Sequence, residues 1–102
     1  MIYLDDANLE IVKKILKKWT PDKKVLVFGS RVKGNIKPHS DLDLCIMNKE
    51  PLTFETLAYL KEAFSESDIP IRVDIVEWAN ITPAFQAVIK SCYEVIQNTN
   101  FS

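Results

Sequence analysis

The sequence is poor in several residue types that mark whole classes of protein. Its 102 residues include two cysteines, Cys45 and Cys92, which form no CxxC pair and fit a reducing cytoplasm better than a disulfide framework. The longest apolar runs have four or five residues, too few to cross a bilayer. The start of the chain, MIYLDDANLE, lacks the basic and apolar segments of a secretory signal. We therefore expect a cytoplasmic protein without a membrane segment.

Positive and negative charges are nearly balanced. Lys and Arg number 13 and Asp and Glu 14, which gives a net charge of −1. Proteins that bind long nucleic acids usually carry a basic excess, so no such ligand is expected. Basic residues gather in the first 40 positions, where Lys13, Lys14, Lys17 and Lys18 form either the solvated face of a helix or a surface that attracts anions or a partner.

Length and composition predict one globular domain over residues 1–102. Hydrophobic residues make up 47% and charged ones 26%, near the globular average, and no repeat or long linker divides the chain. Hydrophobic spacing predicts an α/β fold with the element order αβ(turn)βαβα. The expected elements are a helix over 6–19, strands over 25–28 and 41–47, a helix over 54–64, a strand over 71–76, and a last helix from Thr82-Pro83 with an apolar face that runs through Cys92 and Ile96.

The two glycines of the chain both fall in one stretch, Gly29 to Gly34, directly after the first strand. This concentration indicates that backbone freedom, or close approach of a ligand, is needed there. Between a buried strand and a short helix, the stretch can direct free N–H groups outward. Together with the Ser30 hydroxyl, these donors suit a polyphosphate. The alternative is an ordinary tight turn.

Two carboxylates follow at the start of the second strand. Strand alternation places Asp41 and Asp43 on one side, with Leu42 and Leu44 buried on the other. Adjacent carboxylates repel each other unless a cation lies between them, and hard oxygen ligands suit Mg²⁺ or Mn²⁺ rather than zinc. The alternative is an exposed acidic strand start.

A third carboxylate, Asp74, lies inside an apolar strand between Val73 and Ile75. Asp is unfavourable in strand interiors, so its position needs a cause. It either pairs with Arg72 or serves as a third metal ligand that also accepts a proton from an attacking hydroxyl. Because a helix joins this strand to the preceding one, we expect a parallel pair with a right-handed crossover, which brings the carboxylates into one sheet.

Taken together, a phosphate loop and three carboxylates are the parts of two-metal nucleotidyl transfer. Two Mg²⁺ ions about 3.5–4 Å apart would flank the α-phosphorus, one at the acceptor oxygen and one at the leaving pyrophosphate. Such chemistry asks mainly for charge neutralisation and in-line positioning, which a small domain can supply.

The pattern Gly29-Ser30, ten residues, Asp41-x-Asp43, with Gly34, Ser40 and the later Asp74, resembles the polymerase-β-type nucleotidyltransferase superfamily. Within it, the chain is most similar to the minimal nucleotidyltransferases (MNT) of HEPN/MNT two-component systems. The resemblance implies a small mixed sheet with helices mainly on one face, the first two motif strands being antiparallel. It also implies that Gly29 and Ser30 hold the triphosphate.

The resemblance further implies an enzyme that uses ATP and two Mg²⁺ ions, with Mn²⁺ as a substitute. Asp41 and Asp43 would bind both metals, and Asp74 the catalytic one. The implied partner is a separately encoded HEPN-domain toxin, and the implied reaction transfers AMP to its tyrosine hydroxyl, so that the chain acts as an antitoxin. Two alternatives stay open: a stoichiometric antitoxin that binds without catalysis, and the catalytic subunit of a two-chain small-molecule nucleotidyltransferase.

The remaining polar residues carry weaker signals. Arg31 and Lys33 lie inside the loop, where they contact phosphate oxygens or remain solvated, and Ser40 is assigned to nucleotide binding with them. His39 is expected to be an exposed loop residue. Glu77 either extends the acidic site or caps its strand.

The remaining apolar residues are expected to pack. Cys45 and Cys92 are expected to be small core residues. Trp19 and Trp78 are expected to pack in the core or at an interface rather than to stack on a base.

Overall fold

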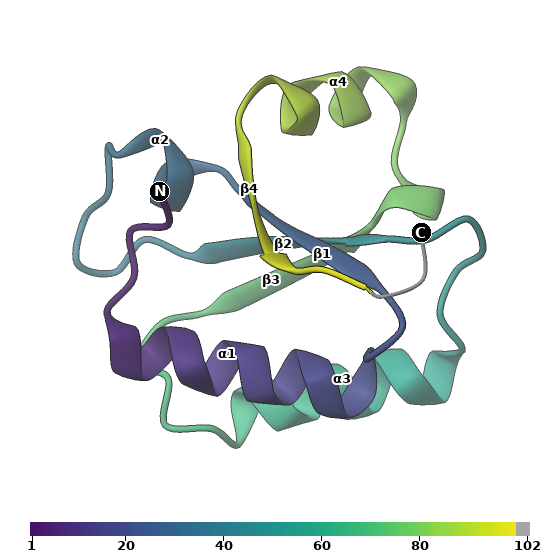
Figure 1. The fold of residues 1–102 in the computed structure, drawn as a ribbon, viewed down its shortest axis with the longest axis horizontal. Coiled ribbons are helices and arrows are strands. Elements are labelled where there is room, and N and C mark those ends of the chain that lie inside the picture. The colour runs from purple at the N-terminus through teal and green to yellow at the C-terminus, as the bar shows by residue number, and fades with distance from the viewer. Residues whose placement is uncertain (100–102) are drawn as a thin grey trace.

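The computed structural model describes residues 1–99 and contains a four-stranded mixed sheet in the order β3-β2-β1-β4 (Figure 1). The sheet is covered by two long helices on one face and a shorter one on the other. In chain order the elements are α1 (Asp6–Trp19), β1 (Lys24–Phe28), α2 (Ser30–Lys33), β2 (Leu42–Met47), α3 (Phe54–Ser65), β3 (Val73–Glu77), a 3₁₀ turn (Trp78–Asn80), α4 (Pro83–Ser91) and β4 (Tyr93–Gln97).

Side-chain caps begin the three longer helices. Asp5, Thr53 and Thr82 have extended backbones, and each accepts a hydrogen bond from the N–H three residues later. Such caps satisfy donors that the first helical turn leaves free. Thr53 and Thr82-Pro83 therefore start helices where the sequence predicted them.

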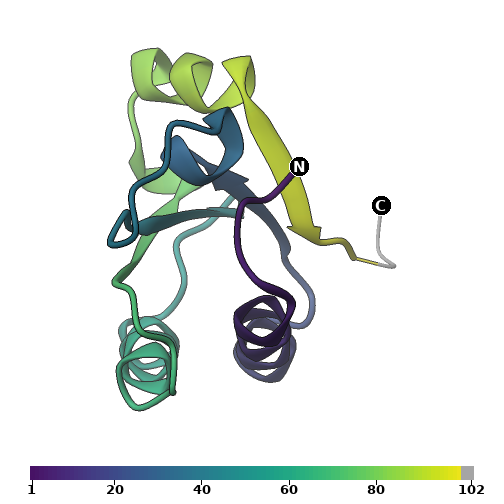
Figure 2. The same cartoon turned by 90° about the vertical axis from the view of Figure 1, so that its left-hand side faces the viewer.

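The two faces of the sheet bury different cores. On one face α1 and α3 lie side by side beneath the strands, and on the other lies α4 (Figure 2). The larger core packs Leu42, Leu44 and Ile46 against α1 and α3. The smaller core contains Cys45, which is fully buried, with Leu26 and Phe28. The predicted α/β fold and the alternation along β2 are confirmed.

Strand directions follow from the connections. β1 and β2 are antiparallel, as the resemblance implied, whereas β2 and β3 are parallel neighbours joined through α3. The predicted crossover pair is therefore confirmed. Because β2 lies between β1 and β3, the residues that begin β2 stand next to the end of β1 and the start of β3. The predicted site residues come from these three places.

The prediction for the end of the chain is wrong in part. Helix α4 ends at Ser91, Cys92 has an extended backbone, and Tyr93–Gln97 forms β4 antiparallel to β1. Without β4, one edge of the largely apolar β1 would be unpaired. Backbone pairing along that edge outweighs the helical spacing of Cys92 and Ile96. Ile96 reaches the larger core from the strand, and Cys92 is only half-buried.

Both tryptophans pack as predicted. Trp19 stacks on Tyr59 of α3 with ring centroids 5.3 Å apart, and Trp78 packs against the smaller core with the Lys90 ammonium over its ring. The four lysines of α1 are exposed. None of the helices within residues 1–99 has the length and apolar character needed to cross a membrane.

Candidate active site

Gly29 links β1 to α2 and lies directly against Asp43. Its φ of 80° and ψ of −155° fall in a region that only glycine adopts readily. A Cβ atom built on Gly29 would stand 2.4 Å from the Asp43 Oδ2 atom. The glycine therefore meets two needs at once, a left-handed backbone and close approach to a carboxylate. This goes beyond the requirements of an ordinary tight turn.

The loop after Gly29 presents unused backbone donors. The Gly29 carbonyl accepts from the N–H groups of Val32 and Lys33, and the Ser30 carbonyl from that of Gly34. The N–H groups of Ser30 and Arg31 open helix α2, and first-turn N–H groups have no acceptor inside a helix. With the Ser30 hydroxyl beside them, these donors can bind the oxygens of a polyphosphate.

Three carboxylates lie near the start of β2 and β3. Asp43 and Asp74 are partners in the parallel register, so their side chains leave the same face of the sheet, and Asp41 precedes β2 by one residue. Burial raises the pKa of Asp43, and the Asp74 and Asp41 carboxylates raise that pKa further. These three residues are thus electrostatic neighbours, as the crossover predicted.

This donor set fits a divalent cation. Like charges held together destabilise the ionised form of Asp43, and a cation between them would remove that repulsion. Three carboxylates are hard oxygen ligands of the kind Mg²⁺ and Mn²⁺ prefer. Over residues 1–99, however, no three His, Cys, Asp or Glu side chains are already arranged closely enough to hold an ion. A cation held by all three carboxylates would therefore require them to turn from their present positions.

One such movement involves Arg72. Its guanidinium donates to the Asp74 carboxylate at 3.0 Å, while 74% of the Arg72 side chain and 39% of that of Asp74 are exposed. The pairing expected for Arg72 is therefore present. Exposed ion pairs contribute little free energy, so Arg72 can give way to a metal ion at Asp74.

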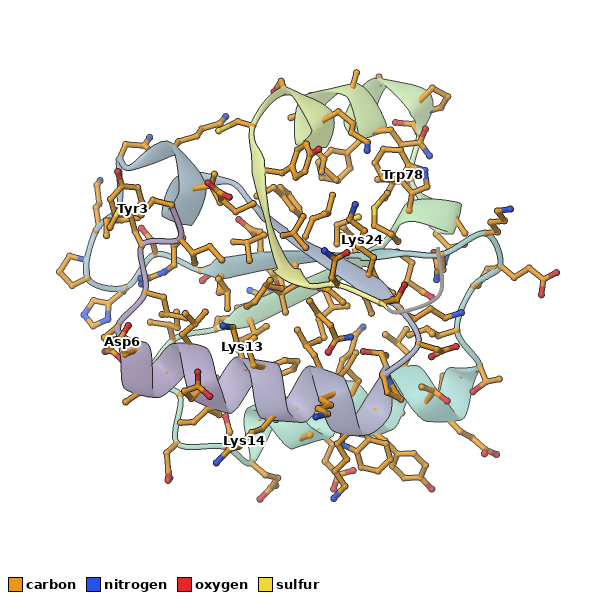
Figure 3. All side chains as sticks on the ribbon, viewed as in Figure 1. Tyr3, Asp6, Lys13, Lys14, Lys24 and Trp78 are labelled. Atoms are coloured by element: carbon orange, nitrogen blue, oxygen red, sulfur yellow. The ribbon has the colours of Figure 1, made fainter. Side chains whose placement is uncertain are left out.

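Arg31 has a different environment from the one expected for a phosphate ligand. Its side chain is buried, and its Nε and Nη1 atoms donate to the carbonyls of Ser40 at 3.0 Å and Tyr3 at 2.8 Å. The Tyr3 N–H in turn donates to the Arg31 carbonyl. The Tyr3 side chain, labelled beside α2 in Figure 3, has its ring against Gly34. Arg31 thereby ties the glycine loop to the residue before Asp41.

Replacing Arg31 by lysine is expected to lower the free energy of unfolding of the nucleotide-free protein by about 1–3 kcal/mol. A lysine keeps the charge but cannot donate to both carbonyls with the fixed fork of a guanidinium. Urea denaturation measures the loss, with the exposed Lys33→Ala as a neighbour on α2 that should leave stability unchanged. Unaltered stability of Arg31→Lys would contradict this structural role.

The other predicted residues fall into two groups. Lys33, the last residue of α2, and His39, in the loop between α2 and β2, are exposed. The Ser40 hydroxyl accepts from the Lys37 N–H at 2.8 Å. Glu77 is buried and accepts hydrogen bonds from Asn48 and from the Leu52 N–H. Glu77 thus anchors the end of β3. Of its two predicted roles, the structure supports the strand cap and not an extension of the acidic site.

Sequence reasoning missed Tyr3. Its backbone holds Arg31, and its ring covers Gly34. The sequence offered one hint, an arginine within a loop otherwise suited to phosphate. That hint does not show that Tyr3 is the residue to which Arg31 binds.

A protein-family model matches most of the chain. The model described as polymerase beta, nucleotidyltransferase matches residues 10–102. A probable protein adenylyltransferase MntA of Haemophilus influenzae is 54% identical over 94 residues, covering 92% of this chain and 82% of that protein. A spectinomycin 9-adenylyltransferase of Enterococcus faecalis is 35% identical over 83 residues, and the match spans 78% of this chain but only 31% of that protein.

Solved structures share the fold. A toxin–antitoxin crystal structure with AMP-PNP superposes with a TM-score of 0.75 at 19% identity, over 91% of this chain and 75% of that one. A complex of a tri-AMPylated Shewanella oneidensis HEPN toxin with its MNT antitoxin gives a TM-score of 0.67 at 17% identity, over 94% and 74% of the two chains. At these identities the superpositions support the arrangement of helices and strands alone.

Proposed function

Because the chain belongs to the polymerase-β nucleotidyltransferase family, we propose that it transfers AMP from ATP to a hydroxyl group on a partner protein. The predicted family resemblance and enzyme class, a nucleotidyltransferase, are confirmed. In the proposal, the partner is an HEPN-domain toxin, the acceptor is a tyrosine, and the chain works in the cytoplasm as the antitoxin. The name of the H. influenzae relative and the AMPylated toxin in the S. oneidensis complex support this choice.

One observation carries the proposal: Asp43 and Asp74 are register partners on one face, beside a glycine whose positive φ and contact with Asp43 strain any larger residue. Asp41, Asp43 and Asp74 would hold two Mg²⁺ ions, or Mn²⁺ in their place. When bound, such ions neutralise phosphate charge and favour the ionised form of an attacking hydroxyl. The N–H groups of Ser30 and Arg31 and the Ser30 hydroxyl would bind the β- and γ-phosphates.

The transfer breaks one bond and forms one. The acceptor oxygen attacks the α-phosphorus of ATP, and the bond from that phosphorus to the oxygen bridging to the β-phosphate breaks. AMP remains on the acceptor as a phosphodiester, and pyrophosphate leaves with the bonding electron pair. The Asp74 carboxylate accepts the hydroxyl proton, for which a carboxylate next to the acceptor is suited.

A partner is also needed to close the site. Asp74 is partly exposed, Lys33 and His39 are solvated, and no second domain within residues 1–99 covers the carboxylates. Water would otherwise compete with the acceptor for the α-phosphorus. A bound partner protein would exclude it.

The test incubates the chain with its HEPN partner, Mg²⁺ and ATP labelled at the α-phosphate. We expect label on the partner with the wild type and with Asp22→Ala, an exposed acid outside the site, and none with Asp41→Ala. Neutralisation of the toxin by Asp41→Ala without label would indicate the stoichiometric antitoxin instead. Label on a small acceptor and not on protein would indicate the two-chain small-molecule enzyme.

A further inference from the structure

A groove runs along the outer edge of the sheet, between β3 and α3. Strand β3 has only β2 as a neighbour, so within residues 1–99 its other side is an open edge. The groove encloses about 410 Å³ and is lined by Lys61, Phe64 and Ser65 of α3 and by Val73, Asp74 and Ile75 of β3, among others. A helix facing an open strand edge is a setting in which proteins bind extended peptides.

The backbone of β3 offers this groove unused hydrogen-bonding groups. The Leu42 N–H donates to the Arg72 carbonyl at 2.9 Å, and Leu42 is the register partner of Val73. Bonding groups alternate along a parallel ladder, so Asp74 directs its N–H and C=O toward β2, whereas Val73 and Ile75 direct theirs outward. A row of such groups is a template for another strand.

We propose that an extended segment of the partner protein pairs with this edge of β3 and so delivers the acceptor hydroxyl to Asp74; this inference rests on the proposed function. An added strand lies about 4.8 Å from its neighbour, and its side chains alternate between the two faces. One set enters the groove beside α3, and the other lies on the face that carries Asp74. Asp43, Asp74 and the acceptor then occupy three neighbouring strands on one face.

The residues that line the groove indicate which side chains the partner segment should carry. Phe64, Val73 and Ile75 favour apolar residues immediately before and after the acceptor, because these two positions face the groove. Arg72 shares the face of Asp74, and Lys61 is exposed on α3, so acidic side chains two residues from the acceptor and at the rim complement the site. The partner segment is therefore extended, acidic, and carries one hydroxyl between apolar residues.

Val73→Pro tests the backbone pairing. The proline removes an outward N–H and no bond to β2, which is the position where an edge strand tolerates proline. Val73→Ala is the matched variant, because it also shortens the side chain but keeps the N–H. We expect Val73→Pro to label the partner about tenfold more slowly than Val73→Ala, the effect of one lost backbone hydrogen bond, while ATP binding is equal in the two.

Ser65→Trp tests the groove. Ser65 is exposed, so the indole fills the groove without entering the core, whereas Glu10→Trp adds the same side chain to an exposed position of α1. Ser65→Trp should slow partner labelling about tenfold or more, and Glu10→Trp should match the wild type. Hydrogen exchange in the complex measures the pairing independently of AMP transfer. The amides of Val73 and Ile75 should exchange more slowly in the complex than in the free chain.

The outcomes separate the two proposals. If the wild type labels the partner, but Val73→Pro and Ser65→Trp label it as fast as their comparison variants, the edge-pairing inference is overturned and the proposed function stands. Unchanged exchange of the Val73 and Ile75 amides in the complex would overturn the inference as well. A wild-type chain that labels no protein would overturn the proposed function, and this inference with it.

Discussion

Asp43→Asn is expected to slow AMP transfer by about a thousandfold and, at neutral pH, to stabilise the metal-free protein. The carboxylate is a proposed metal ligand, and loss of about 4 kcal/mol of transition-state stabilisation corresponds to a rate about a thousandfold lower. The same carboxylate is half-buried against Gly29 and beside Asp74 and Asp41. An amide of nearly equal shape removes that repulsion, so activity and stability should change in opposite directions.

The pH dependence of this effect has a defined sign. Burial and the two neighbouring carboxylates raise the folded-state pKa of Asp43 above its ordinary value of 3.8. Between that value and the raised pKa, the folded state binds more protons than the unfolded state, so stability falls as the pH rises through this interval. The cost persists at neutral pH in the wild type and is absent in Asp43→Asn.

Thermal denaturation over a range of pH measures this difference. Asp43→Asn should have the higher melting temperature at neutral pH, and its advantage should shrink as the pH is lowered toward 3.8. Added Mn²⁺ should raise the melting temperature of the wild type and not that of the variant. A variant less stable than the wild type at neutral pH, measured without metal, would contradict the predicted repulsion at Asp43.

Gly29→Ala is expected to fold with reduced stability and to lose most of its activity. A Cβ at this position would stand 2.4 Å from the Asp43 Oδ2 atom, and the φ of 80° is strained for any other residue. The strain costs about 1–3 kcal/mol, and the displaced carboxylate can no longer meet Asp74 in the same arrangement. We expect AMP transfer to fall by about a hundredfold, which corresponds to about 2.7 kcal/mol.

Gly34→Ala is the matched control for this prediction. Gly34 also has a positive φ, 94°, but its Cβ would meet the Tyr3 ring at 3.3 Å rather than a carboxylate. Both variants should lose similar stability in urea denaturation, and only Gly29→Ala should lose most of its labelling of the partner. Equal loss of labelling in the two would mean that the contact with Asp43 has no special part in the reaction.

The features that the sequence predicted well depend on local chemistry. Asp41 and Asp43 alternate with buried residues at the start of β2, and the long crossover through α3 favours a parallel pair of β2 and β3. The pairing of Asp43 with Asp74 fits that expectation. The two glycines carry positive φ values, as their concentration indicated. The sequence also offered close approach of a ligand as a reason for glycine, whereas the neighbour that the structure shows at Gly29 is the Asp43 carboxylate.

The features that the sequence did not predict depend on distant partners. Ile96 follows Ile89 and Cys92 at helical spacing, and only the open edge of β1 makes a strand the better state for it. Arg31 was assigned to nucleotide because the phosphate loop contains it, yet its acceptors are the backbone carbonyls of Tyr3 and Ser40. Every residue has a backbone carbonyl, so no pattern of residue types reveals which carbonyls accept from Arg31.

The most direct measurement of the proposed metal site follows amide resonances of the chain during titration with paramagnetic Mn²⁺ in the presence of a non-hydrolysable ATP analogue. The site should broaden first the resonances of Gly29, Asp41, Asp43 and Asp74, and Asp43→Asn should require much more Mn²⁺ for the same broadening. Broadening centred elsewhere in the fold, or equal Mn²⁺ requirements for the wild type and Asp43→Asn, would contradict a shared cation site formed by these three carboxylates.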